Sequence, residues 1–180
     1  MGCTRTMAGA TRWLVFCTVL AAAACGGHSP PSTQDAGPSF VADQGDFEGF
    51  TTWESFDGGT EPADSLVGIA QRTLYLNRRP PHGATEYPLG TIIVKTTNGQ
   101  QTFAMAKRGG GFNSDGALNW EWFELATSTT GSVEIVWRGS AAPASVPYGR
   151  PGSVTCNQCH FDDAFYKDFV AGTAIQLSNF

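Results

Sequence analysis

The sequence predicts an α+β fold, in which a mostly antiparallel β-sheet is accompanied by a few short helices. Three observations lead to this prediction. Runs rich in β-branched and aromatic residues recur between turn signals, and the 180 residues include 22 glycines and 10 prolines, which supply many turns. Asn98-Gly99 separates two such runs, as the turn of a hairpin does. The length suits one domain of ordinary size with its own core.

The candidate strands are short runs of β-forming residues bounded by turn-forming residues. The proline-rich stretch 77–88 is predicted as a loop, because proline donates no hydrogen bond to a β-ladder. Trp120 and Trp122 lie two apart in one candidate strand, so they are expected to share a face. We predict strands at 66–77, 91–97, 101–107, 119–126 and 132–139.

The hairpin at Asn98-Gly99 can close in two registers. A two-residue turn would place Lys95 opposite Thr102, whereas a three-residue turn would place it opposite Phe103. Only the second register puts Lys95 and Phe103 on one face of the sheet, and the composition does not choose between them.

Short helices are predicted on either side of these strands. Aromatic residues recur at every third position from 47 to 56, which predicts a short helix with one aromatic face. Residues 160–170 are predicted to form a second short helix.

Residues 1–24 are predicted to be a signal peptide of the lipoprotein type. Positive residues precede an apolar run at 13–24, which is too short to span a bilayer and typical of a secretion signal. The small residues Ala22, Ala23 and Ala24 stand directly before Cys25, as in a bacterial lipobox, so Cys25 is predicted to carry lipid and to begin the mature chain. Simple secretion and a retained anchor are the alternatives.

Residues 25–46 are predicted to form the lipidated N-terminus and a flexible tether, because they are rich in Gly, Pro, Ser and Asp without periodicity. The domain is expected to cover 47–180. Gly26 carries no acidic retention signal, so similarity to other lipoproteins predicts a lipid anchor on the periplasmic side of the outer membrane rather than of the inner one. The formal net charge of −5 disfavours an extended nucleic-acid surface.

The motif CNQCH, residues 156–160, carries the cysteine chemistry of the predicted mature chain. A structural zinc ion needs four ligands, and the domain offers only His82 beyond the motif. A redox dithiol of the thioredoxin type needs a βαβ context that the strand pattern lacks. The sequence CxxCH is the signature of c-type haem attachment, in which both thiols bond to the haem and the histidine ligates the iron. We therefore predict one covalent haem c, attached through Cys156 and Cys159, with His160 as the iron ligand.

No methionine follows His160, and Met105 falls in a candidate strand, where a core position is expected. The second axial position of the iron is therefore expected to be open or water-filled. An open position predicts the binding of small molecules rather than plain electron transfer.

Six segments, in their order along the chain, resemble the cytochrome P-460 family, which includes cytochrome c′-beta. They run from residue 46 to residue 160: DFEGFTTW, IAQRTLYLN, YPLGTIIVKTT, AMAKRGGGFN, NWEWFELA and CNQCH. The resemblance implies a mostly antiparallel domain with short helices and a single haem near the C-terminus. It also implies a homodimer, since members of the family are commonly dimeric.

The resemblance extends to single residues. Cys156, Cys159 and His160 match the haem anchors and the proximal ligand. Lys95 matches the lysine that in cytochrome P-460 bonds to a haem carbon and supports oxidation of hydroxylamine to nitrous oxide, and Arg72 matches an arginine near the haem pocket. A crosslinked lysine, a haem-adjacent lysine and an ordinary strand lysine all stay open for Lys95.

The resemblance also exposes a departure at Phe103. Family members that oxidise hydroxylamine carry a proton-relaying glutamate at or beside this position, whereas this sequence has no acid between Tyr87 and Arg108. Phenylalanine cannot transfer protons, and an apolar distal wall resembles cytochrome c′-beta, which binds nitric oxide.

The expected function is thus the binding of small nitrogen compounds at a c-type haem. In the enzymatic version hydroxylamine is oxidised and electrons pass to a soluble acceptor. The alternatives are a non-catalytic nitric oxide-binding protein and an electron-transfer lipoprotein.

Overall fold

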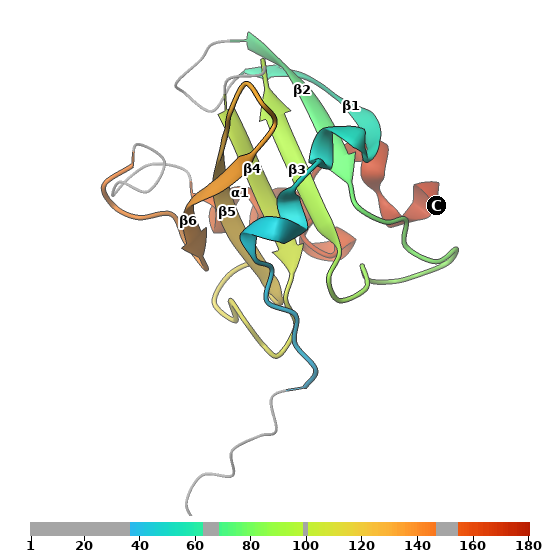
Figure 1. Cartoon of the computed structure of the whole chain (residues 1–180). Coiled ribbons are helices and arrows are strands. Elements are labelled where there is room, and N and C mark those ends of the chain that lie inside the picture. Colours follow the sequence, from blue (N-terminus) through green and yellow to red (C-terminus); the bar gives the residue numbers. More distant parts are fainter. Residues whose placement is uncertain (1–36, 63–68, 99–100, 147–154) are drawn as a thin grey trace, which may run out of the picture. The chain divides into compact units, whose positions relative to one another are not determined.

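Six antiparallel strands form one sheet, and their order in the sheet is their order in the chain (Figure 1). The computed structural model describes residues 37–62, 69–98, 101–146 and 155–180. The strands are β1 (Glu54–Pro62), β2 (Ile69–Leu76), β3 (Ile92–Thr97), β4 (Gln101–Lys107), β5 (Trp120–Thr127) and β6 (Val133–Gly139). Together with short helical segments, this sheet confirms the predicted α+β class.

The strands β3 to β6 begin and end within one residue of the predicted ranges. The first strand, β1, was not predicted, because Gly58-Gly59 and several charged residues remove the apolar alternation of an ordinary strand. It pairs with β2 across a register shift between Asp57 and Thr60, where Gly59 adopts a φ of 74°. This β-bulge is the backbone irregularity that a glycine pair accommodates.

The helix predicted from the aromatic spacing at 47–56 is wrong. The chain forms two separate 3-10 turns instead, η1 (Gln44–Phe47) and η2 (Phe50–Thr52), and residue 56 lies in β1. Between the two turns Gly49 takes a left-handed φ of 68°, which interrupts a continuous helix.

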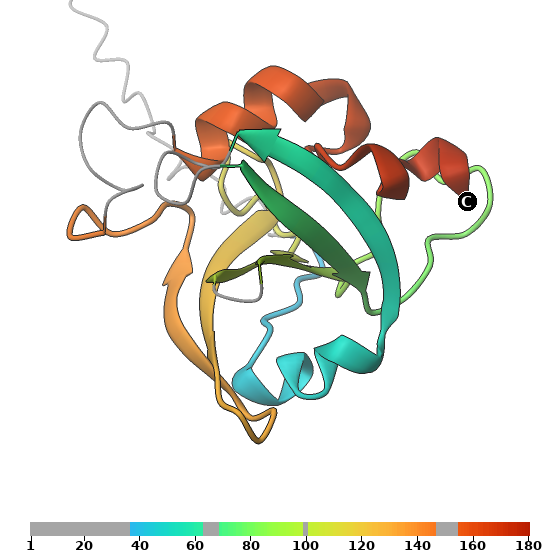
Figure 2. The same cartoon turned by 90° about the horizontal axis from the view of Figure 1, so that it is seen from above.

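Helical segments cover both faces of the sheet (Figure 2). The turns η1 and η2 lie on one face, and the C-terminal segments lie on the other: α1 (Cys156–Ala164), η4 (Phe165–Lys167), η5 (Thr173–Ile175) and η6 (Leu177–Asn179). The helix predicted at 160–170 therefore begins earlier, at Cys156. The Thr155 side chain caps it by accepting a hydrogen bond from the backbone N–H of Gln158 at 3.2 Å.

Alternation along the strands produces two hydrophobic clusters, one on each face. The cluster on the face covered by α1, here called the α1-side cluster, includes Leu74, Leu76, Ile93, Met105, Trp120, Trp122 and Trp137, with Phe169, Val170 and Ile175 from the C-terminal segment. The opposite cluster includes Phe47, Phe50, Ile92, Val94, Phe123 and Leu125. Met105, Trp120 and Trp122 are thus core residues on one face, as expected.

The domain begins before residue 47, so part of the predicted tether is wrongly assigned. Phe40 donates its backbone N–H to the carbonyl of Arg108 at 2.8 Å, and Ala42 is completely buried. Arg138 donates to the Ala42 carbonyl at 2.6 Å while pairing with the buried carboxylate of Glu121. Residues 40 and 42 make these bonds through their backbone groups, and the buried residue is a small alanine. Composition therefore gives little sign that this segment belongs to the domain.

The predicted signal peptide, the lipidation site Cys25 and the tether up to residue 36 lie outside the described residues. Within the described ranges no helix is long and apolar enough to cross a membrane.

The packing of η1 on the sheet can be tested with Phe47→Ala. The Phe47 ring is completely buried and its centroid lies 4.9 Å from that of Phe123. Its removal should lower the free energy of unfolding by about 3–5 kcal/mol, measured by urea unfolding followed by circular dichroism. The control Val41→Ala, at a site 54% exposed in the same segment, should change it by less than about 0.5 kcal/mol. Equal effects of the two substitutions would contradict this packing.

Candidate functional site

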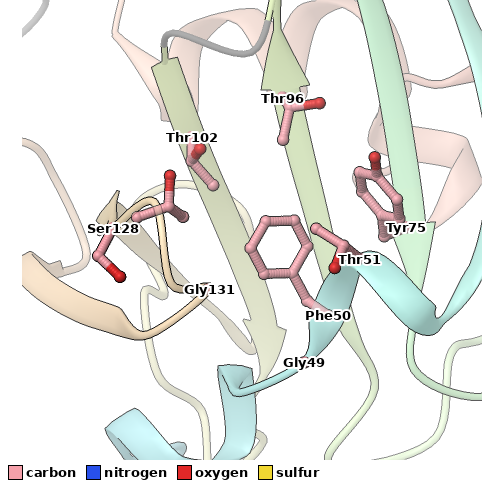
Figure 3. Close-up of a pocket in the computed structure, with 9 residues that line it drawn as sticks. Gly49, Phe50, Thr51, Tyr75, Thr96, Thr102, Ser128 and Gly131 are labelled. Carbon is pink, nitrogen blue, oxygen red and sulfur yellow. The ribbon is translucent and has the colours of Figure 1, made fainter.

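A hollow of about 240 Å³ lies on the sheet face opposite α1 (Figure 3). It is lined by hydroxyl, glycine and aromatic residues, with no acid, base or cysteine among them: Gly49, Phe50, Thr51, Tyr75, Thr96, Thr102, Thr127, Ser128 and Gly131. Such a lining supplies neither a strong metal ligand nor a thiol for covalent attachment. The residues with that chemistry lie on the other face.

The CxxCH motif forms the first turns of α1 and lies over the sheet. Cys156 and Cys159 are both half-buried and stand one helical turn apart, and Cys156 packs against the α1-side cluster. The imidazole of His160 packs against Trp122 of β5, with 4.6 Å between the ring centroids. The motif therefore presents both thiols and the histidine from one short helix resting on β5.

Asn157, between the two cysteines, attaches this helix to three other parts of the fold. Its Oδ1 accepts hydrogen bonds from Trp122 Nε1 and Asn113 Nδ2, both at 2.8 Å. Its Nδ2 donates to the Ser140 carbonyl at 2.8 Å and to Asn113 Oδ1 at 3.0 Å. A Cβ at Gly116 would lie 2.2 Å from the Asn157 side chain, so only glycine fits there. Sequence reasoning missed this residue because it treated the two positions between the cysteines as spacers.

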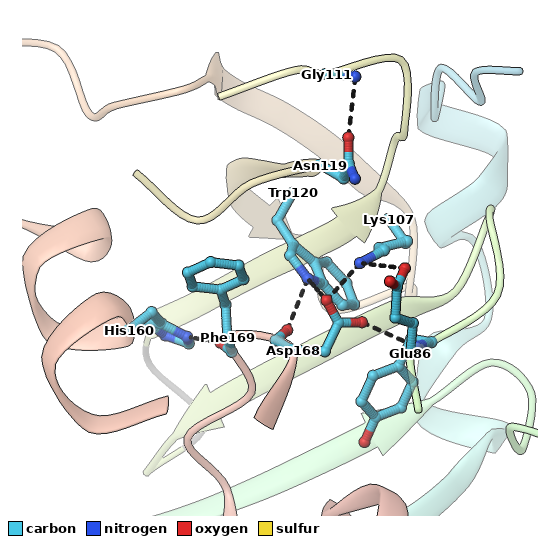
Figure 4. Close-up of polar contacts among 9 residues, drawn as sticks. Glu86, Lys107, Gly111, Asn119, Trp120, His160, Asp168 and Phe169 are labelled. Atoms are coloured by element: carbon cyan, nitrogen blue, oxygen red, sulfur yellow. Dashed lines mark hydrogen bonds and ion pairs between the residues drawn. The ribbon is translucent and has the colours of Figure 1, made fainter. Parts of the chain in front are cut away.

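The tautomer of the neutral His160 ring follows from its contact with the turn after η4. Its Nδ1 lies 2.6 Å from the backbone carbonyl oxygen of Phe169 (Figure 4). A carbonyl only accepts hydrogen bonds, so Nδ1 carries the proton and the lone pair of the neutral ring is on Nε2. Metal-ligating histidines typically have this second hydrogen bond, which orients the ring.

Lys95 of β3 lies opposite Phe103 of β4, and Thr97 lies opposite Gln101, so the second of the two predicted registers is the one observed. The ammonium group of Lys95 lies 5.6 Å from the centre of the Phe103 ring. Lys95 also pairs with Leu74, a member of the α1-side cluster. Directly opposed residues share a face, so Lys95 and Phe103 lie on the same side of the sheet as α1.

Glu124 lies in the same cross-strand row, opposite Phe103 on one side and Trp137 on the other. Its Oε2 accepts a hydrogen bond from Trp137 Nε1 at 2.7 Å. The sequence has no acid between Tyr87 and Arg108, but the fold brings Glu124 next to Phe103 from β5. Glu124 was not predicted as a site residue because it belongs to β5 and lies outside the β3–β4 hairpin that holds Lys95 and Phe103. Its spacing of two from Trp122 is the sequence feature that places it on this face.

The predicted site residues that belong to strands, Arg72, Lys95 and Phe103, share the face covered by α1 but lie in two different cross-strand rows. Trp122, which contacts His160, lies in the row next to that of Glu124, Phe103 and Lys95. Arg72, opposite Thr97, lies in the row on the other side of Lys95. Successive rows on one face are two residues, or about 7 Å, apart. Lys95 and Phe103 contact each other, while Arg72 lies one row farther from Trp122.

The donor set fits the predicted haem c better than a zinc ion. Among the residues that the structure describes, no three His, Cys, Asp or Glu side chains lie together as metal ligands. A structural zinc ion would need four. A haem c needs two thiols and one oriented imidazole, which α1 carries together.

No family model matches the chain, and neither the curated proteins nor the solved structures provide a match. The resemblance to the cytochrome P-460 family therefore rests on the sequence motifs and stays a prediction. The positions of the CxxCH residues on α1 and of Lys95, Phe103 and Glu124 on the sheet are the basis for proposing a function.

The role of Asn157 can be tested by the nearly isosteric change Asn157→Asp. The new carboxylate oxygen would face the Ser140 carbonyl and Asn113 Oδ1, so two donated hydrogen bonds are lost and repulsion replaces them. We expect a loss of about 1–3 kcal/mol in the free energy of unfolding, measured by urea denaturation.

The matched control is Gln158→Glu, which makes the same amide-to-acid change on the exposed neighbouring residue. Both new charges lie in the first turn of α1, where the helix dipole acts on them in the same sense. A loss at residue 158 as large as that at residue 157 would refute the anchoring role.

Proposed function

We propose that the chain is a c-type haem protein of the cytochrome P-460 type that binds small nitrogen compounds and oxidises hydroxylamine. The observation that carries the proposal is the hydrogen bond from His160 Nδ1 to the Phe169 carbonyl, within a CxxCH helix beside the Lys95–Phe103–Glu124 row. Cys156 and Cys159 would hold the haem as thioethers, and His160 Nε2 would ligate its iron. Bound haem would supply an iron centre for the nitrogen ligand and for electron removal.

The residues of the chain would contribute orientation, exclusion of water and proton transfer. Trp122 and the Phe169 carbonyl fix the imidazole ring of His160, so the ligand position is set before any substrate binds. The buried aromatic residues of the α1-side cluster exclude water from this side of the sheet. Phe103 adds an apolar wall next to Lys95.

Glu124 is the residue we assign to proton transfer. Oxidation of two hydroxylamine molecules to one nitrous oxide and one water releases four protons and four electrons, so a nearby base is required. The Glu124 carboxylate is half-buried and is oriented by Trp137, which suits a group that accepts protons at a defined position. The electrons would pass to a soluble acceptor, and Arg72 would act as a cationic residue at the edge of the site.

The second candidate is a non-catalytic nitric oxide-binding protein of the cytochrome c′-beta type, which the Phe103 ring favours. A bulky apolar side chain beside the site suits a small uncharged gas better than a polar substrate. In either version we also propose a lipid anchor at Cys25 and a homodimer. The proposed location is the periplasm, which is where c-type haem is attached.

Covalent haem attachment is the first test. The full chain, produced with a c-type haem maturation system, should keep one haem after denaturation, seen by intact mass and haem staining. The Cys156→Ser/Cys159→Ser variant should lose it, and the control Gln158→Ala, inside the same motif, should keep it. A purified chain that contains zinc and no haem would exclude the proposal.

The state of Lys95 determines the optical spectrum of the reduced protein. A crosslinked lysine should give a broad, red-shifted Soret band, and both Lys95→Ala and Lys95→Arg should return it to an ordinary position. Arginine keeps the positive charge, so a shift that survives in Lys95→Arg would be electrostatic and would rule out the crosslink. An ordinary high-spin spectrum in the wild type would favour the gas-binding version, and sharp low-spin bands would favour electron transfer.

Glu124→Gln should lower hydroxylamine turnover by roughly 10²–10⁴-fold, since the amide cannot accept a proton. The spectrum and the affinity for nitric oxide should stay unchanged, because the substitution is nearly isosteric. The control Glu134→Gln alters an exposed acid on β6 and should leave turnover intact. Full turnover in Glu124→Gln would remove this residue from the mechanism.

A further inference from the structure

Lys107 and Asp168 form a buried ion pair on the α1 side of the sheet, at the end away from Arg72. Their side chains are 4% and 6% exposed, and Lys107 Nζ contacts Asp168 Oδ1 directly (Figure 4). Glu86 approaches the same ammonium group at 3.9 Å but is 71% exposed. A buried pair of charges loses much solvation free energy, which its attraction repays only where the geometry is good and further hydrogen bonds are made.

The pair holds both the side chain and the backbone of Asp168 in place. The backbone N–H of Tyr87 donates to Asp168 Oδ2 at 2.8 Å, and Trp120 Nε1 donates to the Asp168 backbone carbonyl at 2.8 Å. The Lys107 ammonium group also lies 5.2 Å from the centre of a Trp120 ring. Burial raises the pKa of Asp168, and the hydrogen bond from Lys107 opposes this effect. Residues from three separate segments thus converge on Asp168.

The backbone at this point has an unusual conformation. Asp168 and Phe169 are consecutive non-glycine residues with left-handed φ values of 50° and 61°. Aspartate tolerates this region, but for a bulky aromatic residue it is rare. The turn reverses the chain after η4 and brings the Phe169 carbonyl to His160 Nδ1. Such a turn persists only where its surroundings hold it.

We infer that Lys107, Asp168 and Trp120 form a positioning network that holds the Phe169 carbonyl in hydrogen-bonding contact with His160 Nδ1. The network thereby sets the orientation and basicity of the imidazole. The inference rests on the proposed haem ligand role of His160 and assigns regulation of that ligand to residues that do not touch it. A strong bond from Nδ1–H to a carbonyl increases the electron density at Nε2, which stabilises the oxidised iron and lowers its reduction potential.

Two variants test the network. Asp168→Asn removes the charge that pairs with Lys107 but keeps a side-chain acceptor and a residue that tolerates the left-handed turn. Trp120→Phe removes the N–H that donates to the Asp168 carbonyl and keeps an aromatic ring at this buried position. The control is Glu86→Gln, which alters the exposed acid near Lys107.

In the haem-loaded protein, each test variant should shift the reduction equilibrium about tenfold towards the reduced state, which is about 59 mV for one electron. The iron–histidine stretching frequency of the reduced protein should fall in parallel, and Glu86→Gln should change neither. Variants that unfold more easily but keep the wild-type potential and frequency would show a merely structural network and overturn the inference.

The network can also be tested if the proposed haem attachment proves wrong. If the purified chain carries no haem, heteronuclear NMR of the His160 ring nitrogens still reports the tautomer. The network then predicts a proton on Nδ1 in the wild type and a mixture of tautomers in Trp120→Phe. An unchanged tautomer in that variant would overturn the network independently of the haem.

Discussion

Asn157 lies between the two cysteines of the motif and bonds to β5, to the loop before β5 and to the segment after β6. The position of α1, and hence of both thiols and of His160, depends on these bonds. The helix has nine residues, and a helix this short is marginal by itself in water. An amide side chain that uses both its donor and its acceptor fixes not only the distance of the helix from the sheet but also its rotation.

The face below α1 combines an apolar row with charged rows. Its middle row is apolar and aromatic, with Met105 and Trp122 opposed, and it supports the histidine. The rows on either side carry charge: Lys95 and Glu124 in one, Lys107 in the other. Phe103 stands between Lys95 and Glu124, so the two charged residues are two strands, or about 10 Å, apart. A lysine and an acid separated in this way can keep different chemical roles.

Much of this arrangement could be predicted from the sequence, because it follows from local patterns. The Asn-Gly turn and the alternation in β3 to β6 locate the sheet, and CxxCH locates the thiols and the histidine. The strand β1 could not be predicted, since its bulge is stabilised by pairing with β2 rather than by its own residues. The predicted aromatic helix failed because a single left-handed glycine outweighs a favourable spacing. Glu124 required the pairing of β4 with β5, which are separated by a long loop.

The residues that orient His160 are the least visible in sequence, and the reason is physical. Its ring is held by a carbonyl, which every residue possesses, at a turn whose left-handed φ values belong to Asp168 and Phe169 rather than to glycine. That turn is held in turn by Lys107 and Trp120, which lie more than forty residues earlier in the chain. The five-residue motif therefore predicts which thiols and which imidazole α1 carries. Contacts with β5 and with the turn after η4 determine how the His160 ring is oriented. The orientation of the His160 ring therefore depends on the β-domain, through a few buried hydrogen bonds to the turn that follows η4.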